Sequence, residues 1–352
     1  MELKKHRIVI VRSGNLRFWL TFIGIICLHI FIVFGSKMSV QNVDSYGYIK
    51  IARDLVSGGK IASVQYPFLY PLLLTPALIF GDHFLDVMGF IQVILSVLPL
   101  VICYFLLKDE IGKKHAVLCG LICSLLPVAI RHSALIMSEN LFYPLVILIF
   151  IFHFRFRGDS HIIRNSILAG VILFAVFATK YISLPLAPLL CIYWGAGYYR
   201  KENKMKGMRN VFVSMFIYTG TVLSLITAYA LYYVHRNSVP LSVSVFRKIL
   251  GFSVASGPDR VGYVFLPEMK WIVLYLLYMF MISAPIIYAL IMSWDSMPKD
   301  FRAKAAGILR LTIVIGLVFL YAAARHSTLA PYNADGVMKK MLARYVTYIS
   351  AL

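Results

Sequence analysis

The sequence has few charged residues for its length. Only 14% of its 352 residues are Asp, Glu, Lys or Arg, whereas a soluble protein carries about 25%. Hydrophobic residues make up 60% of the chain, more than the roughly 45–50% of a soluble domain. These proportions exclude an ordinary cytosolic enzyme, a disordered chain and a secreted disulfide scaffold, and they indicate a multispanning membrane protein.

Cysteine is also scarce, and its placement favours neither disulfides nor a zinc site. All five cysteines lie inside apolar segments, and the one pair at helical spacing has no histidine or second cysteine pair beside it. The cysteines are Cys27, Cys103, Cys119, Cys123 and Cys191. We expect them to face lipid or the protein core.

Acidic residues are the scarcest charges, with 15 Asp and Glu against 35 Lys and Arg and a net charge of +20. A nucleic-acid-binding protein would carry such an excess on one face of a soluble fold. Here the basic residues occur in short bursts between apolar stretches, as the positive-inside rule describes. The charge therefore indicates membrane orientation, and we expect no nucleic-acid partner.

Nine apolar stretches predict membrane-spanning helices, since a span needs about 20 apolar residues. They lie at 18–36, 84–107, 115–130, 137–154, 163–179, 182–199, 211–234, 271–293 and 305–324. We predict an all-α, polytopic integral membrane protein that forms a single domain over 1–352. The first stretch is too long for a cleavable signal peptide and has no small-residue cleavage motif after it.

Basic residues concentrate in the N-terminal tail and in every second loop, which predicts that this side is cytoplasmic. The longer loops at 37–83, 235–270 and 325–352 then face outward. Most of the acids fall on that side: Asp44, Asp54, Asp82, Asp86, Glu139, Asp259, Glu268 and Asp335. So do the cations Arg131, Lys180, Arg325 and Arg344. Such a cluster is expected of an active site at the outer face of a cell membrane.

Residues 42–56 read as a short amphipathic helix in the first outer loop, ended by Gly58-Gly59. It would lie in the membrane interface and place Asp44 near the mouth of the helix bundle. Asp44 is then either a helix N-cap, for which aspartate is preferred, or a general base. Residues 65–72 follow as a proline-fixed, aromatic turn that re-enters the membrane, although Tyr66 and Tyr70 also suit ordinary interfacial anchors.

These residues resemble the first outer loop of the family-C (GT-C) glycosyltransferases. The resemblance rests on Asp44 after the first span, on Tyr48 and Ala52-Arg53 in the interfacial helix, and on the Tyr-Pro-x-x-Tyr-Pro pattern from Tyr66. That superfamily includes the protein O-mannosyltransferases and the lipid A aminoarabinose transferases. Its members are multispanning enzymes that transfer a sugar from a polyprenyl-phosphate carrier on the outer or lumenal face.

The likeness extends along most of the chain through short motifs. Ser138-Glu139-Asn140 is similar to the acidic motif of the family's second loop, and Thr179-Lys180 and Arg344-Tyr345 continue it. Two departures leave the substrate class open: Asp44-Ser45 stands where many relatives carry an acidic pair, and Tyr66-Pro67-Phe68 where others carry Lys-Pro-Pro. Since relatives are usually longer, we also expect a chain shortened at its C-terminus.

The resemblance implies an inverting transfer to an acceptor hydroxyl on a glycan, lipid or protein. Deprotonating that hydroxyl requires a base, for which Asp44 is the candidate. The leaving phosphate requires cations, for which the candidates are Lys180, Arg131, Arg325 and Arg344. Tyr48, Tyr66 and Tyr70 are expected to line the acceptor and donor pocket.

Glu139 and Lys180 each have two interpretations. On one interpretation, Glu139 is explained by the dipole of a helix that begins there, which stabilises an acidic residue in its first turn. Alternatively, it is a second carboxylate that holds Mg²⁺ or Mn²⁺ together with Asp44, or that orients the acceptor. Lys180 either extends toward water from a hairpin tip or binds phosphate, because a cation at that depth needs a partner. Asp82, His83 and Asp86 fit either a metal site or an interfacial helix start.

Two other functions fit the same composition. A lipid-linked saccharide flippase or transporter would carry charges along a path across the bilayer and break no bond. A non-catalytic scaffold would not bring the outer carboxylates together. The distance between Asp44 and Glu139 distinguishes a scaffold from an enzyme in which both carboxylates belong to one active site.

Overall fold

The computed structural model describes residues 13–35, 43–61, 66–180, 186–199 and 204–240. The chain divides into two compact units, and all of these residues belong to the first, which comprises Met1–Gly251 and Ala303–Ile308; the second comprises Phe252–Arg302 and Leu309–Leu352. The predicted spans at 271–293 and 305–324 and the outer loop at 325–352 lie outside the described residues. The single domain over 1–352 stays a prediction.

The described part of the chain is helical and contains no strand, which confirms the all-α prediction. Its helices are α1 (Ser13–Gly35), α2 (Val43–Ser57), α3 (Leu69–Leu74), η1 (Thr75–His83), α4 (Phe84–Ile111), α5 (Lys113–Leu125), α6 (Pro127–Ser133), α7 (Glu139–Phe156), α8 (Ile162–Thr179), α9 (Leu186–Tyr199) and α10 (Lys204–Asn237).

Five helical segments of the described chain are long and apolar enough to cross a membrane. They are Phe18–Gly35, Leu69–Ile111, Glu139–Phe156, Ile162–Thr179 and Met205–Asn237. Each coincides with or contains a predicted span, so the membrane assignment holds, while the count of nine spans stays a prediction.

The expected span at 115–130 is not one continuous helix. It consists of α5 and α6, which meet at Leu126, whose φ of −56° and ψ of 133° are extended rather than helical. Proline disfavours the α conformation of the residue before it and suits the first position of a new helix. Pro127 therefore ends α5 after 13 residues.

The amphipathic helix of the first outer loop is present as α2. Tyr48, Ile49 and Ala52 on one face are at most 5% exposed, whereas Lys50 and Arg53 on the other face are exposed. The helix ends before Gly58, which adopts a φ of 76°, a left-handed conformation that glycine takes without a steric penalty.

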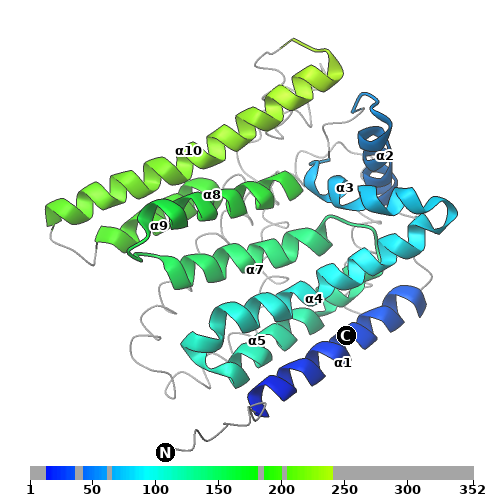
Figure 1. The fold of residues 1–352 in the computed structure, drawn as a ribbon, viewed down its shortest axis with the longest axis horizontal. Helices are drawn as coiled ribbons and strands as arrows, with labels where there is room; N and C mark the ends of the chain where they lie inside the picture. Colours follow the sequence, from blue (N-terminus) through cyan, green and yellow to red (C-terminus); the bar gives the residue numbers. More distant parts are fainter. Residues whose placement is uncertain (1–12, 36–42, 62–65, 181–185, 200–203, 241–352) are drawn as a thin grey trace, which may run out of the picture. The chain divides into compact units, whose positions relative to one another are not determined.

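Two groups of helices build the bundle (Figure 1). α4 packs against α1, α5 and α7, and α10 packs against α8 and α9, with α7 and α8 joining the two groups. One buried cluster lies among α2, α3, η1, α4 and α7 and includes Tyr48, Tyr70 and Leu141. A second cluster holds α1 on α4 and α5, where the rings of Phe18 and Tyr104 stack with centroids 3.9 Å apart.

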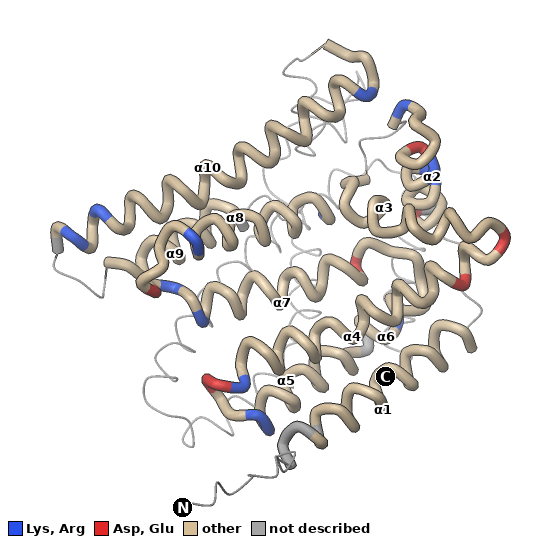
Figure 2. Tube along the Cα trace, viewed as in Figure 1, with Lys and Arg blue, Asp and Glu red and all other residues tan. Residues whose placement is uncertain are grey.

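Charged residues gather at the two ends of these helices (Figure 2). The ends of α4 and α7 and the starts of α5, α8 and α10 carry Lys108, Lys113, Lys114, Arg155, Arg157, Arg164, Lys206 and Arg209. The opposite end, where α2, α3 and the start of α7 lie, carries Asp44, Asp54, Asp82, Asp86 and Glu139 together with Lys50, Arg53, Lys60, Arg131, Lys180 and Arg236. Most of the described acids therefore share one end.

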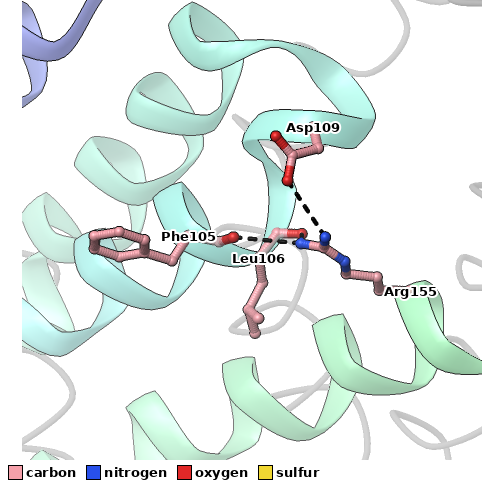
Figure 3. Close-up of polar contacts among 4 residues, drawn as sticks. All are labelled: Phe105, Leu106, Asp109 and Arg155. Carbon is pink, nitrogen blue, oxygen red and sulfur yellow. Dashed lines mark hydrogen bonds and ion pairs between the residues drawn. The ribbon is translucent and has the colours of Figure 1, made fainter.

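At the basic end, Arg155 joins α7 to the last turn of α4 (Figure 3). Its guanidinium donates to the carbonyl oxygens of Phe105 at 3.3 Å and Leu106 at 2.8 Å and pairs with Asp109 at 3.3 Å. Phe105 and Leu106 lie before the last four residues of α4, and a carbonyl oxygen can accept a second hydrogen bond besides the one within the helix. Arg155 thus adds bonds to the C-terminal part of α4 and fixes α7 beside it.

Candidate functional site

Four segments that are distant in sequence meet at the mixed-charge end of the bundle, opposite the basic end. They are the first turns of α2, the turn at 66–68 that precedes α3, the start of α7 and the residue that follows α8. A continuous series of contacts runs from Asp44 through Tyr66, Tyr48, Ser138 and Glu139 to Lys180, as described below. Five of the site residues predicted from the sequence, Asp44, Tyr48, Tyr66, Glu139 and Lys180, therefore lie within this one series.

Asp44 lies in the first turn of α2 and accepts a hydrogen bond from the phenol of Tyr66, with 3.1 Å between oxygens. Tyr66 reaches it from the turn before α3, 22 residues later in the chain. Burial and the adjacent Asp44 carboxylate raise the pKa of Tyr66 to about 12. The phenol therefore stays protonated and remains a donor throughout the physiological range.

Tyr48 links the Asp44 side of the site to the Glu139 side. Its ring lies edge-on to Tyr66 with centroids 4.9 Å apart, and its hydroxyl lies 2.8 Å from Ser138 Oγ. Burial raises the pKa of Tyr48 above its ordinary value; the hydrogen bond with Ser138 opposes this rise, and the nearby charges of Glu139 and Asp44 add to it. The same phenol is thus close enough to both carboxylates to feel their charge.

Glu139 and Lys180 form an ion pair. Lys180 Nζ lies 2.6 Å from Glu139 Oε1, and the two side chains are only 29% and 25% exposed. Ser138 Oγ donates to the other carboxylate oxygen at 3.4 Å. Lys180 also lies 5.8 Å from the centre of the Phe142 ring. The Glu139 carboxylate is therefore one partner of Lys180, which follows the last residue of α8.

A buried amide pair holds the start of α7 in place. Asn140 Nδ2 donates to Gln92 Oε1 at 2.6 Å and to the carbonyls of His132 and Leu135 at 2.7 and 2.8 Å. Gln92 is fully buried on α4 and Asn140 is 5% exposed. These bonds connect the loop before α7 to α4, and so they set the position of the adjacent Ser138 and Glu139.

Sequence analysis alone did not assign roles to Ser138, Asn140 or Gln92. Gln92 could have been noticed as an isolated polar residue inside an apolar span, because such residues require an internal partner. Ser138 and Asn140 flank Glu139 in the quoted motif, but their partners are 90 and 48 residues away in the chain. No local pattern indicates those pairings.

The remaining predicted site residues are distributed differently. Tyr70 is fully buried and packs edge-on against Tyr48 with centroids 5.0 Å apart, so it supports the site from within the core. Arg131 lies on α6, which precedes the loop to α7, and is partly buried. Arg325 and Arg344 lie outside the described residues.

The described chain brings no three His, Cys, Asp or Glu side chains together in a way that could hold a metal ion. Glu139 uses one carboxylate oxygen for Lys180 and the other for Ser138. The His83–Asp86 contact of 3.5 Å is between highly exposed side chains at the start of α4, as expected of an interfacial helix start. The divalent cation stays a prediction, and no chemical step is derived through it.

No family model matches the sequence, and the search of curated proteins returns no match.

Proposed function

We propose that the protein is an inverting membrane glycosyltransferase that transfers a sugar from a polyprenyl-phosphate carrier to an acceptor hydroxyl at the outer face of the cell membrane. One observation carries the proposal, namely the series of contacts that joins Asp44, Tyr66, Tyr48, Glu139 and Lys180 at one end of the bundle. It brings a carboxylate and a cation together beside an interfacial helix, where the head of a lipid-linked donor lies.

Asp44 is the proposed general base. It removes the proton of the acceptor hydroxyl as that oxygen attacks the anomeric carbon of the donor, and direct attack inverts the anomeric centre. A positioned base of this kind accelerates transfer by roughly 10²–10⁴-fold. The carboxylate can accept several hydrogen bonds, so the bond from Tyr66 is compatible with a second one from the acceptor.

Lys180 is the proposed partner of the leaving polyprenyl phosphate. The bond from the anomeric carbon to the phosphate oxygen breaks with its electron pair on that oxygen, and a cation stabilises the charge that develops. An ammonium group carries three N–H donors, so an ion pair with Glu139 is compatible with a phosphate contact. Glu139 holds the lysine at the site before the donor binds.

The proposed orientation places the mixed-charge end outside the cell and the basic end in the cytoplasm. It is supported by the distribution of the described charges, since the end where α4 and α7 finish carries eight Lys and Arg against three Asp and Glu, whereas the other end carries six against five. Cytoplasmic loops carry such an excess. The amphipathic helix α2 then lies along the outer interface.

The test is transfer by the purified protein from a panel of polyprenyl-phosphate sugars, measured as release of free polyprenyl phosphate. Wild-type protein should release it with at least one donor, and Asp44→Asn should abolish release while the protein still inserts into the membrane. Asp86→Asn is the matched control, because Asp86 is an exposed acid at the same end. Full activity of Asp44→Asn would refute the assignment, and sugar movement across vesicles without phosphate release would instead identify a transporter.

A further inference from the structure

Gly47 lies in the interior of a helix, where glycine is unfavourable. It lies within α2 between Asp44 and Tyr48, where glycine costs roughly 0.5–1 kcal/mol relative to alanine. The backbone conformation does not explain it, because helical backbone suits any residue other than proline. The reason for glycine must therefore be sought in what approaches this position.

The ring of Tyr66 lies directly over Gly47. A Cβ atom at this position would be 2.5 Å from Cε2 and 2.9 Å from Cζ of Tyr66, much closer than the roughly 3.5–4.0 Å at which carbon atoms make favourable contact. Any larger residue would push the ring away. Gly47 is therefore the position that allows the phenol to reach Asp44.

We propose that Tyr66 is a positioning residue that orients the Asp44 carboxylate toward the acceptor, and that Gly47 provides the space in which its ring lies. This inference rests on the proposed function, in which Asp44 is the base. The hydrogen bond of 3.1 Å fixes one carboxylate oxygen, and the edge-on contact with Tyr48 fixes the ring. The carboxylate is then held in one orientation rather than rotating among several.

The hydroxyl and the ring of Tyr66 contribute to this arrangement separately, and each can be removed by a different substitution. Phenylalanine at position 66 keeps the ring against Gly47 and Tyr48 but loses the bond to Asp44. Leucine at position 66 removes the ring atoms that a Cβ on residue 47 would meet. These two substitutions therefore separate the effect of the hydrogen bond from the effect of the contact.

The first experiment measures kcat and KM for the variants. Tyr66→Phe should lower kcat about tenfold, as expected when a hydrogen bond to a charged group worth roughly 1.4 kcal/mol is lost, and should leave the KM for donor within about twofold. Tyr46→Phe is the matched control, because Tyr46 is 63% exposed on the same helix, and should leave kcat unchanged. A raised KM with unchanged kcat for Tyr66→Phe would overturn the proposal and make Tyr66 a substrate contact.

The second experiment tests Gly47. Gly47→Ala should lower kcat at least as much as Tyr66→Phe, and it should have no further effect in a Tyr66→Leu background because the ring is absent. Gly24→Ala and Gly220→Ala are matched controls, since a Cβ at either helical position meets nothing within 4 Å, and both should keep full activity. An equal loss from Gly47→Ala in both backgrounds would overturn the role of the close contact.

A readout that does not require transfer distinguishes this inference from the proposed function. The phenol of Tyr66 is titrated spectroscopically as the difference between wild type and Tyr66→Phe. Its pKa, about 12 in part because of Asp44, should fall in both Asp44→Asn and Gly47→Ala. If Asp44→Asn keeps full activity but lowers this pKa, the proposed function fails while the contact stands; if neither variant changes it, the positioning inference fails.

Discussion

At the scale of single residues, the ion pair between Glu139 and Lys180 differs from an ordinary surface pair. Both side chains are less than a third exposed, so solvent screens the pair less than it would at the surface. Removing one partner of such a pair leaves an uncompensated charge in a poorly solvated place. The two residues should therefore depend on one another for stability as well as for any role with substrate.

Lys180→Ala and Glu139→Ala should each destabilise the protein by about 1–3 kcal/mol. The double variant should be less destabilised than the sum of the two, since it leaves neither charge unpaired. Thermal unfolding in detergent of the wild type, both single variants and the double variant measures this coupling. Additive losses would contradict an energetically significant pair.

The phenol of Tyr66 gives a testable pH dependence of stability. Its pKa rises from about 10 to about 12 on folding because of burial and the Asp44 carboxylate. The folded state therefore favours the protonated phenol, and this contribution is complete below pH 10 and is lost as the pH rises toward 12. Between pH 10 and pH 12, the free energy of unfolding should fall more for wild type than for Tyr66→Phe. The same pH dependence of unfolding in both proteins would contradict this prediction.

At the scale of helices, α2 is held at its C-terminal end by an arginine from α10. Arg236 donates from Nε to the carbonyl of Gly59 at 3.0 Å. Its Nη2 donates to the carbonyls of Asp54 and Leu55 at 3.1 and 3.2 Å. Asp54 and Leu55 are among the last four residues of α2, whose carbonyls lack partners within the helix, and Gly59 follows the helix. One side chain thus ties the helix that carries Asp44 to a helix about 180 residues later in the chain.

Arg236→Gln should loosen the end of α2 without unfolding the bundle. Backbone amides over residues 54–60 should exchange with deuterium faster, by about the tenfold that loss of roughly 1.4 kcal/mol implies. Arg209→Gln, on the opposite end of α10, is the matched control and should leave that exchange unchanged. Hydrogen exchange read by mass spectrometry checks both variants, and equal protection in Arg236→Gln would contradict the tie.

The origin of each helical feature determines how well sequence alone predicts it. α2 and its end at Gly58 follow from local periodicity and a glycine signal, and both were predicted. The break at Leu126 also has a local cause in Pro127, but the apolar run across it suggested one continuous span. The Glu139–Lys180 and Asn140–Gln92 contacts depend on how α4, α7 and α8 pack, and no local pattern specifies them.

At the scale of the whole molecule, the sparse charges divide the described helices into a basic end and a mixed end. Asp44, Glu139 and Lys180 could be assigned to one side because alternating spans fix the side of each loop. Their direct linkage could not be assigned, because many residues share a side without touching. The composition and the alternation of the spans therefore predict the side of the membrane on which residues lie, while side-chain packing determines which of those residues contact one another.

Single cysteines at the two ends should report the orientation of the protein. In a background without the five native cysteines, Asp82→Cys should react with a membrane-impermeant maleimide in intact cells, and Lys206→Cys should react only after the membrane is permeabilised. Both positions are exposed and lie at opposite ends of the described bundle. The reverse pattern of labelling would contradict the orientation that the positive-inside rule predicts.

The anchors at both ends of α7 have a consequence for how the protein can move. Asn140 holds the first turn of α7 to Gln92, and Arg155 holds its last turn to the Leu106 carbonyl. The two attachment points are separated by nearly equal lengths of parallel helix, so sliding by one residue, about 1.5 Å, would break both. α4 and α7 are therefore held together at both ends, and under the proposed function access for a lipid-linked donor would come from movement of the segments around this helix pair.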